Sequence, residues 1–199
     1  MNRRRLLALL GALPAVVMPA ADAANSDTAN TGNPGTLWQQ LKSGGHVLLI
    51  RHAITDPGVG DPPGFDLGNC ATQRNLSAAG REEARRLGSA LQQLGIPVAA
   101  VRSSRWCRCL DTARLAFGRA DPWPALDNTF ETPGRRPQQM NEIRRSLAQP
   151  VSGGNLVLVT HGVNILALTG ISPAENEIVA VRTGDKGRFT VIGRGIPYR

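Results

Sequence analysis

Short apolar runs that alternate with helix-like segments are the feature that most restricts the fold of this 199-residue chain. We expect buried strands at residues 46–50 (HVLLI), 97–101 (PVAAV) and 155–160 (NLVLVT). A further strand or extended segment is expected around Ala125–Phe130. Near the C-terminus, EIVAV and FTVIG predict a hairpin around Thr183–Gly187.

Helices are expected between these runs. Ser77 can cap a helix on which apolar residues recur at helical spacing, and Gly95 would end it. The other helix-like segments are residues 37–41, 105–117, 137–147 and 163–169. The order strand, helix, strand, helix, strand, helix, strand pair predicts a three-layer α/β sandwich with a mostly parallel central sheet.

Residues 1–23 have the pattern of an export signal. Arg3–Arg5 form a positive region, LLALLGALPAVVM an apolar core and Ala21–Ala23 a small-x-small cleavage site. The apolar run is shorter than the ~20 residues that span a bilayer, although an uncleaved anchor helix is the alternative. RRRLL also resembles a twin-arginine signal, without the Ser or Thr that precedes one.

The remaining chain is predicted to be one domain. Residues 24–35 are rich in small and polar residues and predict a flexible lead-in, so the domain would occupy residues 36–199. Cleavage of the signal would leave a periplasmic or secreted protein without stable membrane association. The oligomeric state stays open.

The net charge of +8 comes mainly from arginine, because lysine occurs only as Lys42 and Lys186. Arginine suits bidentate contact with phosphate or carboxylate, although genome composition is an equally good explanation for the surface as a whole. Aromatic residues make up only 4% of the chain, which argues against a nucleic-acid partner bound by base stacking.

The three cysteines are Cys70, Cys107 and Cys109. In an oxidising compartment, Cys70 is expected to pair with Cys107 or Cys109, because Cys107 and Cys109 are too close in sequence to bridge well. A cysteine phosphatase loop requires Arg six residues after its nucleophile. The residues at those positions are Leu76, Ala113 and Leu115. Cysteine-based phosphatase chemistry is therefore excluded, and CRC supplies too few ligands for zinc.

Candidate site residues follow three of the predicted strands. Arg51 and His52 come directly after the first strand, and His161 comes directly after residues 155–160. In an open α/β sheet, functional groups gather at the carboxyl ends of the strands. Ser104, Arg108 and Thr112 follow residues 97–101. Their spacing of four puts them on one face of a helix.

These segments resemble the histidine phosphatase superfamily, which has the phosphoglycerate mutase-like fold. The resemblance covers roughly residues 45–195. It rests on four motifs in order, namely LLIRHA, RNLSAAGREEARRLGSAL, SSRWCRCLDTA and LVTHG. Ala53 stands where the family's Arg-His-Gly signature has glycine. Each motif alone is weak, but their order and their places behind the expected elements make the combination specific.

The resemblance implies that His52 is a nucleophile that carries the phosphoryl group, while Arg51, Arg108 and His161 bind its oxygens. No metal or other cofactor is expected, since fixed cations supply the charge that phosphoryl transfer needs. Thr55 and Arg74 are further candidates for contact with the substrate.

The general acid is expected in a loop after the arginine-bearing helix. Glu131 is the leading candidate. The competing carboxylates are Asp56, Asp61 and Asp66 in the long loop of residues 53–75.

The expected activity is metal-independent hydrolysis of small phosphomonoesters, of the histidine acid phosphatase type. Three alternatives stay open: a protein phosphohistidine phosphatase, a phosphomutase and a non-catalytic binder of phosphate ligands on the same fold. Substrate specificity is expected to lie in residues 53–75 and 119–140.

Overall fold

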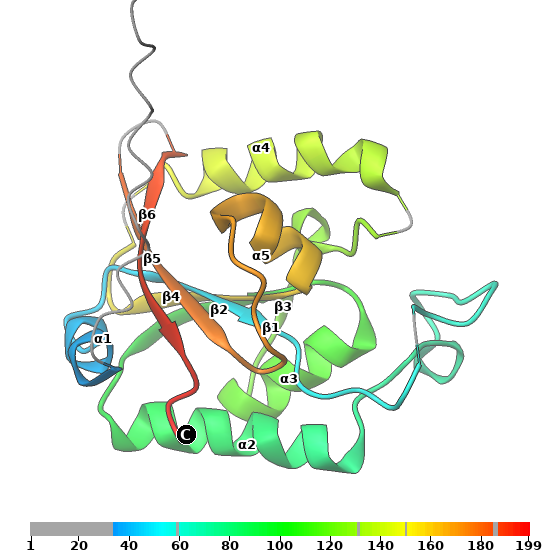
Figure 1. Cartoon of the computed structure of the whole chain (residues 1–199), viewed down its shortest axis with the longest axis horizontal. Helices are drawn as coiled ribbons and strands as arrows, with labels where there is room; N and C mark the ends of the chain where they lie inside the picture. The colour runs from blue at the N-terminus through cyan, green and yellow to red at the C-terminus, as the bar shows by residue number, and fades with distance from the viewer. Residues whose placement is uncertain (1–33, 59, 131, 150, 185–186) are drawn as a thin grey trace, which may run out of the picture.

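The computed structural model describes residues 34–199 except 59, 131, 150 and 185–186. A six-stranded mixed sheet forms its centre (Figure 1). The strands in sheet order are β3 (Asp121–Pro122), β2 (Val98–Ser103), β4 (Asn155–Thr160), β1 (Val47–Arg51), β5 (Ile178–Thr183) and β6 (Phe189–Gly195). The predicted export signal and candidate Glu131 lie outside the described residues.

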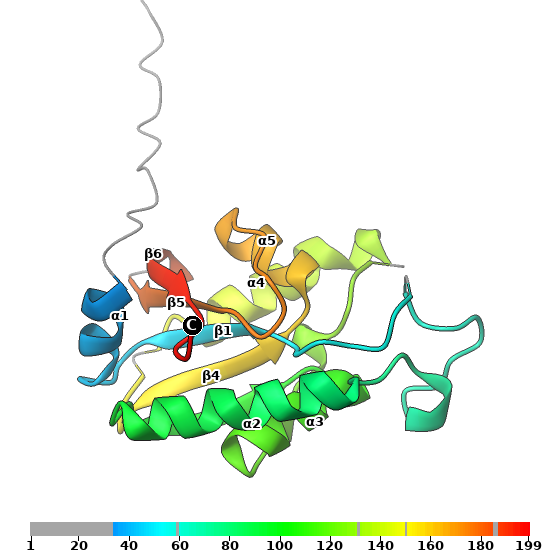
Figure 2. The same cartoon turned by 60° about the horizontal axis from the view of Figure 1, so that its bottom comes forward.

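The helices cover both faces of the sheet, as the turned view shows (Figure 2). Helices α2 (Ala78–Gln93) and α3 (Cys107–Phe117) pack together on one face, and α4 (Arg136–Ser146) and α5 (Gly162–Thr169) lie on the other. Helix α1 (Pro34–Leu41) packs against β6. Short 3-10 helices occupy Cys70–Thr72, Pro124–Leu126 and Pro133–Arg135.

Alternating side chains of β1 separate two hydrophobic cores. Leu48 and Ile50 face the core formed with α1, α2 and α3, whereas Val47 and Leu49 face the core formed with α4 and α5. Both sets are buried because a central strand with helices on each side exposes neither face. The predicted α/β sandwich is confirmed.

The sheet combines parallel and antiparallel pairing. Strands β1 and β2 each pair in parallel with β4, and β2 also pairs in parallel with β3. The C-terminal hairpin adds β5 and β6 antiparallel to this group. As a result, the carboxyl ends of β2, β4 and β1 meet at one edge of the sheet.

Side-chain and backbone caps define the start of α2 and the end of α3. The Ser77 side chain accepts a hydrogen bond from the Gly80 amide at the start of α2. At the end of α3, Gly118 adopts a left-handed conformation with φ of 70°. Arg108 lies in the first turn of α3.

A strand or extended segment is expected around Ala125–Phe130, but the structure has no strand there. Pro124 begins a 3-10 helix there, because its fixed φ suits a tight turn and its nitrogen cannot donate to a strand ladder. Ala125 and Leu126 are buried in the core beside α4 and α5. The short edge strand β3 lies just upstream. No helix in the described part of the chain is long and apolar enough to cross a membrane.

Candidate active site

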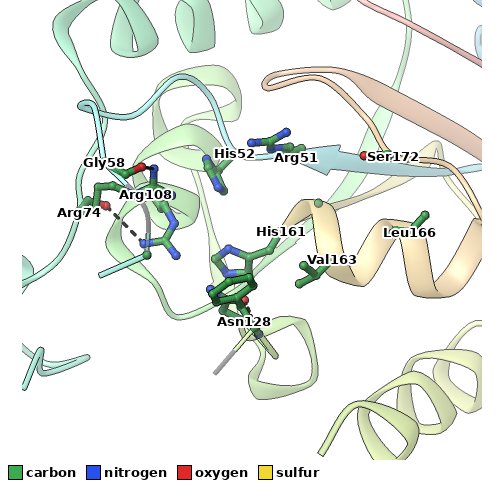
Figure 3. Close-up of a pocket in the computed structure, with 13 residues that line it drawn as sticks. Arg51, His52, Gly58, Arg74, Arg108, Asn128, His161, Val163, Leu166 and Ser172 are labelled. Atoms are coloured by element: carbon green, nitrogen blue, oxygen red, sulfur yellow. Dashed lines mark hydrogen bonds between the residues drawn. The ribbon is translucent and has the colours of Figure 1, made fainter. Parts of the chain in front are cut away.

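Parallel strands β1 and β4 bring two histidines together. Arg51 pairs in register with Thr160, and the His52 amide donates to the Thr160 carbonyl at 3.0 Å. The imidazole rings of His52 and His161 consequently lie with centroids 5.5 Å apart, edge to face (Figure 3). Both side chains are buried except where they line a cavity at the sheet edge.

The surroundings of His52 fix which ring nitrogen is free. Its Nδ1 lies 2.9 Å from the Ala53 carbonyl oxygen, which can only accept a hydrogen bond. A neutral ring therefore carries its proton on Nδ1 and keeps a lone pair on Nε2. The Ala53 amide donates to Oγ1 of Thr112 on α3, at 3.0 Å, which fixes the turn after His52.

The same environment keeps both histidines neutral. Burial, opposed by the hydrogen bond to Ala53 and reinforced by the charges of Arg108, Arg51 and Arg74, lowers the pKa of His52 to about 3. Burial and the neighbouring charges of His52 and the arginines also hold the pKa of His161 well below its usual value. A neutral imidazole is the nucleophilic form.

Helix α3 supplies the most deeply buried cation of the site. The side chains of Arg108 and Asp61 are only 1% and 2% exposed, and Arg108 Nη1 lies 2.7 Å from Asp61 Oδ1. Nη2 of the same guanidinium donates to Asp61 Oδ2 at 3.2 Å. Arg108 also lines the cavity with His52 and His161.

Two further arginines line the cavity and are held by neighbouring backbone. Arg51 Nη1 donates to the Pro173 carbonyl at 3.0 Å, and its Nη2 lies 3.5 Å from Glu175 Oε1. Arg74 Nη1 donates to the Gly58 carbonyl at 2.7 Å. Because these contacts leave donors of both guanidiniums unused, the cavity presents three arginines to an anion.

The cavity has a volume of about 340 Å³ and a different character at its two ends. The histidines and arginines line one end, and α5 contributes Val163 and Leu166 farther along (Figure 3). Phe130 adds to the apolar lining. Phe130 and Leu166 are 58% and 47% exposed, and they are the exposed large hydrophobic side chains among the described residues. Such exposure beside a cavity is typical of a ligand contact.

Ser104 and Thr112 support the site from the two ends of one segment. The Ser104 hydroxyl lies 2.9 Å from Nε2 of His161, and Thr112 holds Ala53. The expected helical face holds for Arg108 and Thr112, but Ser104 lies before α3, which begins at Cys107, and reaches the site from that preceding segment. Trp106 packs edge to face on His161, with ring centroids 5.5 Å apart.

The loop candidates have different positions. Arg74 lines the cavity. Thr55 is buried but is not among the residues that line the cavity, and its backbone forms an isolated β-bridge with Leu76. Asp56 and Asp66 are exposed and also lie outside the lining. Glu131 is outside the described residues, and no carboxylate occurs among the described residues that line the cavity.

Of the two possible cysteine pairs, the structure contains the disulfide between Cys70 and Cys107. Cys109 is free and buried, with Sγ 3.5 Å from His161 Nε2. Burial raises the pKa of its thiol to about 12, so it is not a thiolate nucleophile at neutral pH. Within the described residues, no three His, Cys, Asp or Glu side chains gather as a metal site requires.

Several site residues were not identified from the sequence. The sequence suggests Asp61 only as a candidate acid, and nothing in the sequence marks Glu175 as the partner of Arg51. The cavity also includes Asn128, Phe130, Leu166 and Ser172. No hydrophobic periodicity in the sequence marks Phe130 and Leu166 as cavity residues. Phe130 does fall in the segment 119–140, where substrate specificity is expected.

Comparisons with known proteins agree with this arrangement. The family model described as histidine phosphatase superfamily (branch 1) matches residues 47–131, which include Arg51, His52 and Arg108. The match is a similarity to that family over less than half of the chain. Curated proteins gave no match to the sequence.

Solved structures of phosphatases share the fold at low sequence identity. The protein histidine phosphatase SixA, complexed with tungstate, is 16% identical with a TM-score of 0.52, covering 77% of this chain and 97% of that one. The mycobacterial glucosyl-3-phosphoglycerate phosphatase with inorganic phosphate is 14% identical, with a TM-score of 0.56 and coverage of 78% and 99%. Phosphoserine phosphatase from Entamoeba histolytica is 15% identical, with a TM-score of 0.51 and coverage of 75% of this chain and 96% of that one. These likenesses show the phosphoglycerate mutase-like fold.

Proposed function

We propose that this protein is a metal-independent histidine phosphatase that hydrolyses phosphomonoesters through a phosphohistidine on His52. The observation that carries the proposal is the contact of His52 Nδ1 with the Ala53 carbonyl, which leaves Nε2 free, in a cavity lined by Arg51, Arg74 and Arg108. A nucleophile beside fixed cations is what phosphoryl transfer needs, since the protein's main contributions are positioning and charge stabilisation.

In the first step, His52 Nε2 attacks phosphorus while the bond from phosphorus to the ester oxygen breaks. The arginines neutralise charge on the non-bridging oxygens, and the leaving oxygen takes a proton from a general acid. In the second step, water attacks phosphorus, its proton goes to the same group, and the bond from phosphorus to Nε2 breaks. Inorganic phosphate leaves, and His52 regains its lone pair.

We propose Glu131 as the acid and base. Two observations support it. The described lining of the cavity contains no carboxylate, and Phe130, the residue before Glu131, does line it. Asp61, the buried competitor, has both carboxylate oxygens engaged by hydrogen bonds.

The substrate we propose is a small phosphomonoester whose alcohol carries an apolar or aromatic group. The cavity of about 340 Å³ exceeds the volume of a phosphate ion, and its lining includes the apolar side chains of Phe130, Val163 and Leu166. Burying apolar substrate surface there contributes roughly 25 cal/mol per Å².

Export to the periplasm or outside the cell remains part of the proposal. The disulfide between Cys70 and Cys107 supports it, because disulfides persist mainly in oxidising compartments. Mass determination of the N-terminus after expression in a bacterial host would test cleavage after Ala23. An intact N-terminus in the membrane fraction would contradict it.

The decisive experiment measures phosphate release from p-nitrophenyl phosphate with and without a chelator. We expect chelator-resistant activity that is lost in His52→Ala and strongly reduced in Glu131→Gln. His46→Ala is the matched control, because His46 lies at the opposite end of β1. Activity that survives His52→Ala would contradict the nucleophile. A folded protein that binds phosphate without hydrolysis would be a non-catalytic binder.

The substrate class is tested by comparing p-nitrophenyl phosphate with glycerol phosphate. Phe130→Ala and Leu166→Ala should raise KM for the aryl ester and leave KM for glycerol phosphate nearly unchanged. Equal effects on both esters would contradict the apolar contact. Transfer of a labelled phosphoryl group from His52 to a second alcohol would instead indicate a mutase. Preferential hydrolysis of a phosphohistidine peptide would indicate a protein phosphohistidine phosphatase.

A further inference from the structure

Asp61, in the long loop after β1, is the buried partner of Arg108. Besides the two bonds from Arg108, its oxygens accept a bond from the Arg74 amide at 3.0 Å and one from Trp106 Nε1 at 3.0 Å. The loop backbone adds another contact, since Arg108 Nη1 donates to the Arg74 carbonyl at 3.3 Å. Arg108 and this part of the loop therefore form one bonded unit.

One edge of the Arg108 guanidinium remains free to bind an anion. Of its five N–H groups, both on Nη1 and one on Nη2 are used by Asp61 and Arg74. Nε is buried and has no partner among the described residues. The remaining N–H groups, on Nε and Nη2, share one edge of the planar group.

That free edge has the geometry for a tetrahedral anion. Two parallel N–H groups of one guanidinium bind two oxygens of a phosphoryl group in a bidentate pair. Arg108 lines the cavity beside His52 and His161. We infer that Asp61 is a positioning residue. It binds Nη1 and Nη2 of Arg108, so that the edge formed by Nε and Nη2 faces the phosphoryl group. This inference rests on the proposed function.

The contacts of Asp61 fit positioning better than proton transfer. Burial alone would raise the pKa of Asp61, but its hydrogen bond to Arg108 and the Arg108 charge, with the Arg74 amide and Trp106, lower it. The carboxylate is thus ionised at neutral pH. It also lies outside the lining of the cavity that contains His52 and His161.

The disulfide holds this loop against the helix that carries Arg108. Cys70 belongs to the loop, and Cys107 precedes Arg108 in α3. Gln73 adds a second tie, since its Oε1 accepts a bond from the Cys107 amide at 2.9 Å. Asp61 is therefore supported on a segment with two further attachments to α3.

The test combines variants at both residues in the full protein. Asp61→Asn keeps the side-chain shape but replaces one accepting oxygen by a donor. It should weaken the binding of inorganic phosphate, measured by calorimetry, about tenfold, and raise KM for p-nitrophenyl phosphate by a similar factor. Glu82→Gln is the matched control, because Glu82 also pairs with arginines but is exposed on α2.

A double-mutant cycle distinguishes positioning of Arg108 from general support of the fold. In an Arg108→Lys background, Asp61→Asn should change phosphate affinity less than twofold, because lysine has no second edge to orient. An undiminished effect in that background, or an unaltered affinity in Asp61→Asn alone, would overturn the inference.

A second variant and a separate readout cover the two ways in which this test could fail. If Asp61→Asn does not fold, Trp106→Phe removes a single bond to Asp61 and should weaken phosphate binding in the same direction; unchanged affinity there would count against the inference. If the wild-type protein binds phosphate but hydrolyses nothing, the proposed function fails while the affinity cycle still decides the role of Asp61.

Discussion

The hydroxyl of Ser104 lies 2.9 Å from Nε2 of His161, and both groups are fully or nearly fully buried. This contact links the segment before α3 to the residue after β4. When Nε2 accepts from the hydroxyl, the proton of the neutral ring is on Nδ1, where it can be donated to a phosphoryl oxygen. In this tautomer, the serine orients His161 so that the ring donates through Nδ1.

Replacing Ser104 by alanine should lower kcat/KM for p-nitrophenyl phosphate about tenfold, as expected for one lost orienting hydrogen bond. Steady-state kinetics would measure the effect. Ser103→Ala is the matched control, because the neighbouring buried hydroxyl bonds to the Ser104 carbonyl and not to His161. Equal losses in both variants would show that packing, and not the histidine contact, is responsible.

The tautomer of His52 is a prediction that needs no substrate. Since Nδ1 faces the Ala53 carbonyl at 2.9 Å, we expect the proton on Nδ1 at pH 7. Two-dimensional ¹⁵N spectra that correlate ring nitrogens with ring protons distinguish the tautomers, and His52→Gln would assign the signals. A proton on Nε2 would contradict the proposed nucleophile.

Much of this site follows from local pattern. The run NLVLVT predicts β4 at its observed bounds because a buried strand needs a continuous apolar stretch. His52 and His161 then meet because parallel strands end at one edge. The spacing of Arg108 and Thr112 predicts their common helical face, whereas Ser104 lies before α3 and contacts His161 from outside the helix.

The pairings across the loops could not be predicted in this way. Asp61 and Arg108 are 47 residues apart, and the loop between β1 and α2 has no periodicity that would select Asp61 over Asp56 or Asp66. The same holds for Glu175 and Arg51. Such partners depend on how the loop closes on the sheet, which becomes defined only after the core has packed.

Acidification should reduce the stability of the folded state through His52. Its pKa is about 3 when folded and about 6.5 when unfolded. Between these values the unfolded chain binds a proton that the folded chain does not, so the contribution is fully present above pH 6.5 and is lost as pH falls. The slope is about 1.4 kcal/mol per pH unit.

Urea unfolding at several pH values between 4 and 7 would measure this dependence. His52→Gln should show a shallower fall of the unfolding free energy with acidification than the wild type, since glutamine does not titrate. Parallel curves for wild type and His52→Gln would refute the buried neutral histidine.

The disulfide should contribute substantially to stability and leave one thiol. Cys70 and Cys107 are 37 residues apart, for which the loop-entropy relation gives about 4 kcal/mol. Replacing both by serine should lower the unfolding free energy by about that amount in urea titrations. Alkylation under non-reducing conditions should label only Cys109, and only after unfolding, because its thiol is buried. Three reactive thiols in the native protein would contradict the bridge.

The close packing of α2 on α3 depends on Gly88. A Cβ at Gly88 would overlap the carbonyl of Ala116, whose backbone atoms cannot rotate away as a side chain could. Alanine favours a helix over glycine by about 1 kcal/mol, but overpacking costs about 3 kcal/mol, so Gly88→Ala should destabilise the protein by about 2 kcal/mol. Gly134→Ala, with open space around the position, is the control for urea unfolding. An unchanged midpoint in Gly88→Ala would mean that α2 can move away from α3 at little cost, and that the helix carrying Arg108 is not fixed by this contact.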